Sequence, residues 1–143
     1  QTTIKDYNHF MEKISLSTGT RTEMIDITRH VEKFLNDKKA SSGILVVSSP
    51  HTTAGITVNE NADPDVQHDM MMHLNRSVPQ NAGFKHVEGN ADAHIKGTLV
   101  NFSQTFIIED GELQLGTWQG IYFMEFDGPR EREVWLKFIP ERL

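Results

Sequence analysis

The chain has 143 residues, of which 37% are hydrophobic and 24% are charged, with a formal net charge of −6 and no cysteine. This length suits one domain with a sizeable core, so we expect a single domain over residues 1–143, with residues 1–9 peripheral. The composition excludes a chain-wide basic surface for nucleic acid, disulfides, and thiolate metal ligands, and no apolar run is long enough to cross a bilayer. We therefore expect a cytoplasmic protein that binds neither nucleic acid nor membranes.

The first third of the chain combines strand and helix patterns. Alternating apolar residues predict strands at 14–16 and 25–27. The spacing of Ile27, Val31, Phe34 and Leu35 then predicts a helix. The continuous apolar run 44–47 predicts a strand that is buried on both faces.

The middle of the chain predicts a further strand and two more helices. Apolar and polar residues alternate over 54–58. Asp63-Pro64 begins a helix, because Asp63 can accept hydrogen bonds from free amides and proline suits the first helical position. The inner face of this helix is expected to hold Val66, Met70, His73 and Leu74. The third helix starts with Asn90 or Asp92 as its cap, and we expect Ile95 and Leu99 to face the core.

The last third of the chain is rich in strand patterns. Asp110-Gly111 between apolar alternations predicts a β-hairpin. Residues 118–126 are apolar on both faces and predict a central strand, with Trp118 in the core. A final strand follows at 134–138. This order of elements indicates an α+β fold, with β-sandwich-like antiparallel or mixed sheets and three helices.

Three polar stretches stand out: 49–53, closed by 59–63; 86–94; and 116–119, followed by 125–130. Neutral imidazole is a common ligand for transition metals, and three histidines plus a water would form an open catalytic metal site. His86 and His94 flank a loop that can reverse direction, whereas His51 has to arrive from another strand. Scattered histidines in structural or surface positions are the alternative that spacing alone leaves open.

Other residues in these stretches suit proton transfer or anion binding. Glu60 could move protons if it is partly desolvated, or it could be an ordinary strand-end carboxylate in water. A phosphate could bind the amides that follow Asn90 at a helix start, and Arg130 could clamp it with two hydrogen bonds. Arg130 could instead be a turn residue paired with Glu131 or Glu133, and Lys96 could lie on a solvated helix face. The further ligand-binding candidates are Thr52, Thr53, Lys96, Thr117 and Gln119.

Three blocks of the sequence resemble the YjbQ-like family, whose members are described as secondary thiamine-phosphate synthases. The blocks are SPHTTAGITVNENADP at 49–64, DAHIK at 92–96 and LQLGTWQGI at 113–121. The resemblance covers about residues 10–138 and implies a compact α+β fold with β-sandwich character and a homotrimer. The sequence departs from some members, which carry a longer insert between His86 and His94.

The resemblance also implies a site. It makes His51, His86 and His94 the best candidates for holding a divalent metal ion, with zinc as one candidate, or an anion. It places Glu60, Asn61, Glu88, Gln119, Glu125 and Arg130 around the cleft. Among these, Glu60, Glu125 and Arg130 are the catalytic candidates.

The predicted function is that of a metal-assisted enzyme acting on phosphorylated small molecules. The case that the resemblance implies is a transferase that joins hydroxymethylpyrimidine pyrophosphate to thiazole phosphate, giving thiamine phosphate and pyrophosphate. One alternative is a metal-dependent hydrolase of a phosphorylated metabolite with Glu60 as its base. The other is a trimeric metabolite-binding module without catalysis.

Overall fold

The computed structural model describes residues 11–142, and the peripheral placement expected for residues 1–9 lies outside this range. Eight strands and three helices are present in the described chain, which confirms the α+β class. In chain order they are β1 (Met11–Ser17), β2 (Glu23–Asp26), α2 (Thr28–Asp37), β3 (Gly43–Ser48), β4 (Ala54–Glu60), α3 (Pro64–Ser77), α4 (Ala91–Val100), β5 (Ser103–Glu109), β6 (Glu112–Leu113), β7 (Gln119–Glu125) and β8 (Glu131–Pro140).

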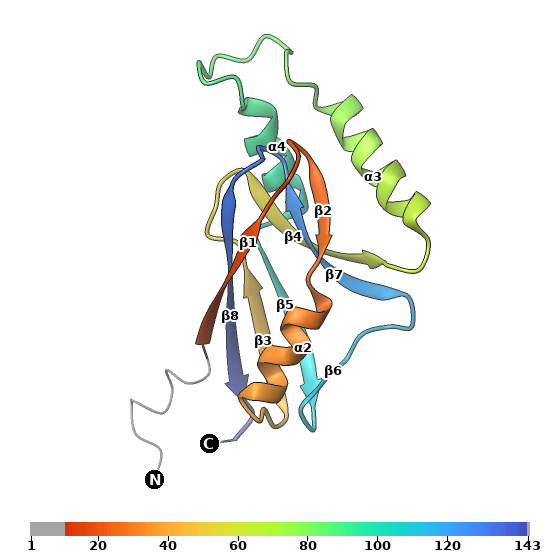
Figure 1. Ribbon diagram of the computed structural model, residues 1–143, viewed down its shortest axis with the longest axis vertical. Coiled ribbons are helices and arrows are strands. Elements are labelled where there is room, and N and C mark those ends of the chain that lie inside the picture. Colours follow the sequence, from red (N-terminus) through yellow and green to blue (C-terminus); the bar gives the residue numbers. More distant parts are fainter. Residues whose placement is uncertain (1–10, 143) are drawn as a thin grey trace.

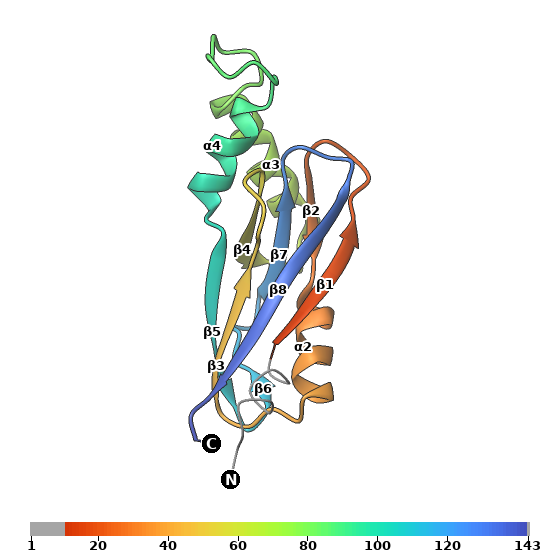
Figure 2. The ribbon, with the colours of Figure 1, turned by 90° about the vertical axis from the view of Figure 1, so that its left-hand side faces the viewer.

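The strands form two antiparallel sheets. One has the order β1-β8-β3-β5-β6 and the other the order β2-β7-β4. Figures 1 and 2 show α3 and α4 together at one end of the molecule and α2 towards the other end. The sheets are joined by a shared core to which α2 contributes Val31, Phe34 and Leu35.

Strand β7 is buried on both faces, as its apolar sequence predicts. Ile121 and Phe123 enter the core between the sheets. Tyr122, Met124 and Phe126 pack with Ala93 of α4 on the other face. The three-stranded sheet therefore lies between the five-stranded sheet and the helices α3 and α4.

The sequence signals for one turn and for one helix start are also confirmed. Asp110 and Gly111 both have positive φ, 49° and 81°, in the tight turn between β5 and β6, a conformation that favours the Asp-Gly pair. Asp63 caps α3 by accepting a hydrogen bond from the Asp65 N–H, and Pro64 is the first helical residue.

Several burial predictions are wrong. Trp118 precedes β7 and is 62% exposed, because the strand begins only at Gln119. In β3 only Leu45 and Val47 are buried, whereas Ile44 lies on the outer face of the sheet beside Ile107 and Ile139.

The inner faces predicted for α3 and α4 also differ from the structure. Leu74 packs against the cluster of Tyr122 and Met124 as predicted, but His73 is exposed and α3 has no fully buried residue. Ile95 and Leu99 are exposed, because α4 instead buries Asp92, Ala93, Lys96 and Gly97. In the described chain no helix is both long and apolar enough to cross a membrane.

Candidate functional site

A polar pocket of about 440 Å³ lies at the end of the molecule that carries α4. Its walls are the β3–β4 loop, the loop before α4, α4 itself and the β7–β8 turn. Eight predicted site residues line it: His51, Thr52, Thr53, His86, Glu88, Asn90, His94 and Arg130. Asp127 and Arg132, which were not among the predicted site residues, also line it. The fold thus brings the three predicted histidines, which come from separate segments of the chain, to one pocket.

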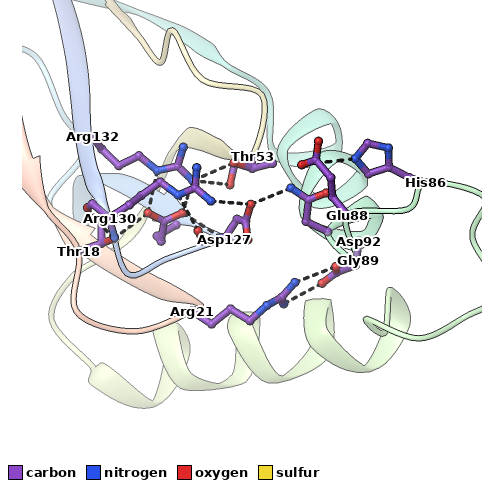
Figure 3. A network of polar contacts seen from close by, with 12 residues as sticks. Thr18, Arg21, Thr53, His86, Glu88, Gly89, Asp92, Asp127, Arg130 and Arg132 are labelled. Atoms are coloured by element: carbon purple, nitrogen blue, oxygen red, sulfur yellow. Dashed lines mark hydrogen bonds and ion pairs between the residues drawn. The ribbon is translucent and has the colours of Figure 1, made fainter.

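Glu125 and Arg132 form a buried ion pair, and Arg132 (Figure 3) also lines the pocket. Arg132 donates from Nε to Glu125 Oε2 at 2.8 Å and from Nη2 to Thr53 Oγ1 at 2.8 Å. Thr18 and the Asp127 N–H also donate to the same carboxylate. Burial would raise the pKa of Glu125, but these hydrogen bonds and the Arg132 charge hold it below its ordinary value. Glu125 therefore stays ionised and anchored, and this placement suits a structural anion better than the predicted catalytic role.

Asp127 links Arg130 to Asn90 across the pocket (Figure 3). Arg130 donates from Nε to the Asp127 carbonyl oxygen at 2.9 Å and from Nη2 to its Oδ2 at 3.0 Å. Asn90 Nδ2 donates to the same Oδ2 at 2.8 Å. Among the described residues, Arg130 Nη1 has no hydrogen-bond partner and remains available to a ligand.

A second buried ion network fixes α4 below the pocket. Asp92 accepts two hydrogen bonds of 3.0 Å from Arg21 and one of 2.9 Å from Lys96 Nζ. Burial would raise the pKa of Asp92, but Arg21 and Lys96 hold it below its ordinary value. Lys96, 2% exposed, also donates to Asn75 Oδ1 on α3. Lys96 therefore holds the helix that carries His94, and it lies neither on the solvated face nor in the ligand pocket that the sequence suggested.

His51 is held by the backbone of β8. The Glu133 N–H donates to His51 Nε2 at 2.8 Å, and the ring meets Phe123 edge-on at a centroid distance of 6.4 Å. Partial burial, followed by the nearby Arg132 charge, lowers the pKa of His51 below 6.5. This imidazole is therefore neutral at physiological pH.

This lowered pKa predicts a pH-dependent stability. Between pH 6.5 and the lower folded-state pKa, the unfolded chain binds a proton that the folded chain does not, so the free energy of unfolding falls as pH falls. His51→Gln should flatten this part of the curve, because glutamine does not titrate. Urea unfolding at a series of pH values measures the slope, and equal slopes for the two proteins would contradict the prediction.

His86 and His94 lie in direct contact. Their ring centroids are 5.3 Å apart and their planes are at 86°. Two imidazoles on one tetrahedral zinc have centroids about 5 Å apart, so this pair fits a shared metal, although edge-to-face aromatic pairs adopt the same separation. In residues 11–142 no group of three His, Asp or Glu side chains is placed to hold a metal ion. The three-histidine metal site stays a prediction, and two of its members have suitable spacing.

The remaining predicted residues lie elsewhere. Asn61, Thr117 and Gln119 line a separate pocket of about 480 Å³ between α2 and β6. Glu60 ends β4, whose first residue, Ala54, adjoins the histidine loop, and the six residue steps between them span about 20 Å. Glu60 is thus too distant to serve as a base in the histidine pocket of the same chain.

Sequence patterns contained a signal for one missed residue. Arg132 shares the core-facing register of β8 with Val134 and Leu136, and Glu125 ends a strand that is apolar on both faces. Opposite charges at two core positions predict a buried pair. Asp127 and Arg21 are surface-type turn residues in the sequence and carry no comparable pattern.

Comparisons with known proteins all point to one family. The family described as "UPF0047 protein YjbQ-like" matches residues 12–141. UPF0047 protein MJ1081 from Methanocaldococcus jannaschii is 52% identical over 130 residues, covering 91% of this chain and 94% of that protein. UPF0047 protein YugU from Bacillus subtilis is 50% identical over 130 residues, covering 90% and 98%. A crystal structure of a conserved YjbQ/UPF0047-family protein from Clostridium acetobutylicum has a TM-score of 0.88 and 54% identity, covering 90% of this chain and 99% of that one.

Proposed function

Since this chain belongs to the UPF0047/YjbQ-like family, we propose that it is a metal-assisted enzyme acting on a phosphorylated small molecule in the pocket of His51, His86 and His94. The observation that carries the proposal is the composition of this pocket. It gathers hydrogen-bond donors and nitrogen ligands from four separate segments into one polar space of about 440 Å³. Such convergence of polar groups in a concave site is typical of small-molecule binding.

The charges of the pocket support a metal. Two arginines, Arg130 and Arg132, line it, and so do two carboxylates, Glu88 and Asp127, so the formal charges of the lining side chains cancel. A phosphate group carries about two negative charges and needs additional positive charge nearby. A divalent cation held by His86 and His94 would supply it and would stabilise a leaving phosphate.

The residues of the chain then have separate roles. Arg130 offers its free Nη1 to a phosphate oxygen, and Asp127 fixes the guanidinium through two hydrogen bonds. Thr52 is exposed in the same wall and can donate its hydroxyl. Glu125 and Arg132 fix the position of Thr53 in the loop that carries His51. Among the described residues no base is hydrogen-bonded to the Thr52 hydroxyl to activate it as a nucleophile, so the site suits alignment and charge neutralisation.

Thiamine phosphate synthesis is the specific reaction that we propose to test first. The bond between the pyrimidine methylene carbon and the pyrophosphate oxygen breaks, and pyrophosphate leaves with the electron pair. The thiazole nitrogen donates its lone pair to that carbon and becomes positively charged. This reaction needs no general base, which agrees with the distance of Glu60 from the pocket. A hydrolase that uses Glu60 of the same chain has no such support.

We expect metal-dependent turnover. Protein stripped with a chelator and reloaded with zinc, manganese or magnesium is incubated with the two precursors, and with a panel of phosphorylated metabolites in parallel. Thiamine phosphate and pyrophosphate, or released phosphate, are measured. Turnover should require metal and should fall at least about 100-fold in His94→Ala, but not in His68→Ala, an exposed histidine on α3. Tight retention of an unreacted metabolite would favour the binding module, and the absence of both turnover and binding would contradict the proposal.

A further inference from the structure

The hydrogen bond from Glu133 determines which nitrogen of His51 carries its proton. A backbone N–H can only donate, so His51 Nε2, 2.8 Å from the Glu133 nitrogen, must offer a lone pair. A neutral imidazole carries one proton, and here that proton must lie on Nδ1. The tautomer of His51 is thus set by the strand β8 and does not depend on any ligand.

The proton on His51 Nδ1 is free to make a further hydrogen bond. The ring is partly buried and lines the same pocket as His86, His94 and Arg130. No described residue bonds to His51 Nδ1, and the only fully buried side-chain polar atom without a partner in the described chain is Asn90 Oδ1. His51 Nδ1 is therefore unpaired and accessible to solvent, on a ring that lines the pocket.

A metal at His51 would require this arrangement to change. A metal binds a nitrogen lone pair in the plane of the ring, but the Nε2 lone pair accepts from Glu133 and Nδ1 is protonated. Binding through Nε2 would break the Glu133 hydrogen bond. Binding through Nδ1 would require an imidazolate or a moved proton. His86 and His94 accept no hydrogen bond of this kind from the described backbone.

We infer that His51 is a fixed hydrogen-bond donor, through Nδ1–H, to an oxygen of the phosphorylated ligand, and that it is not a third metal ligand. This inference rests on the proposed function and divides its pocket into two parts. His86 and His94 offer lone pairs, whereas His51 and Arg130 offer protons. The lowered pKa of His51 supports this role, because a neutral ring keeps one donor at a constant position over the physiological pH range.

Two substitutions separate the two nitrogens of His51. In His51→Gln the side-chain oxygen can still accept from the Glu133 N–H, but no rigid ring holds a donor at the Nδ1 position. We expect pyrophosphate affinity, measured by calorimetry in the presence of zinc, to fall about tenfold or more, as for one hydrogen bond to a charged group. Zinc affinity should stay within about twofold. His51→Asn places an amide donor near the Nδ1 position and should retain more pyrophosphate affinity than His51→Gln.

The tautomer is observed directly by nitrogen NMR of histidine-labelled, metal-free protein. We expect His51 to be protonated at Nδ1 alone. Zinc should shift the signals of His86 and His94 and leave the His51 tautomer unchanged, and pyrophosphate should then shift His51 Nδ1. Protonation at Nε2, or a loss of zinc affinity in His51→Gln, would overturn the assignment of His51 alone. If pyrophosphate binds neither the wild type nor the variants, both the role of His51 and the proposed function are overturned.

Discussion

Replacing Arg132 by methionine should lower the free energy of unfolding by about 3–5 kcal/mol, the largest effect on stability that we expect from one change at the site. Arg132 and Glu125 have side chains that are 3% and 0% exposed, so the substitution leaves a carboxylate buried without its counter-ion. The Thr53 hydroxyl would also lose its hydrogen bond from Nη2. Urea unfolding at neutral pH, followed by circular dichroism, measures the change.

Arg130→Ala is the matched control. Arg130 also pairs with a carboxylate, but its side chain is 50% exposed, and such pairs contribute about 1 kcal/mol or less. The double variant Arg132→Met with Glu125→Leu should regain part of the lost stability, because it removes the uncompensated charge. A loss in Arg132→Met no greater than that in Arg130→Ala would show that the buried pair does not support the pocket.

Replacing His94 by alanine should lower zinc affinity at least about 100-fold. The expectation follows from the 5.3 Å separation of the His86 and His94 ring centroids, which is close to that of two imidazoles on one zinc ion. Loss of one of two protein ligands should exceed the 10- to 100-fold effects typical of groups that only orient a ligand. Competition with a chromophoric chelator measures the affinity, and His86→Ala should give a similar loss.

The control is His68→Ala, which removes an exposed histidine from α3. His68 lies on the helix surface beside Asp69 and does not line the pocket. The zinc affinity of the His68→Ala protein should equal that of the wild type. If His86→Ala and His94→Ala both keep wild-type affinity, their contact is an ordinary aromatic pair and the metal-assisted mechanism fails.

Local sequence patterns predicted much of the fold. The Asp110-Gly111 turn, the helical spacing from Ile27 to Leu35 and the apolar strand before Phe126 each depend on neighbours in sequence. The buried face of α4 could not be predicted in this way. Its orientation depends on Arg21, distant in sequence, which compensates the buried Asp92 and so allows a charged face to turn inward.

Part of the site could also be predicted from residues that are neighbours in sequence. His51, Thr52 and Thr53 are consecutive, and His86 and His94 flank one loop, so each group stays together in space. Asn61 follows the same block of sequence as His51, but the length of β4 places it at another pocket. The hydrogen bond from Glu133 to His51 is made by backbone, which no residue pattern reveals.

Anomalous X-ray diffraction from crystals grown with zinc and pyrophosphate tests the central claim most directly. We expect a zinc peak bonded to His86 and His94, with pyrophosphate oxygens on the zinc and within hydrogen-bond distance of His51 Nδ1. A pocket without zinc at this pair, or zinc and pyrophosphate bound only at other surfaces, would contradict it.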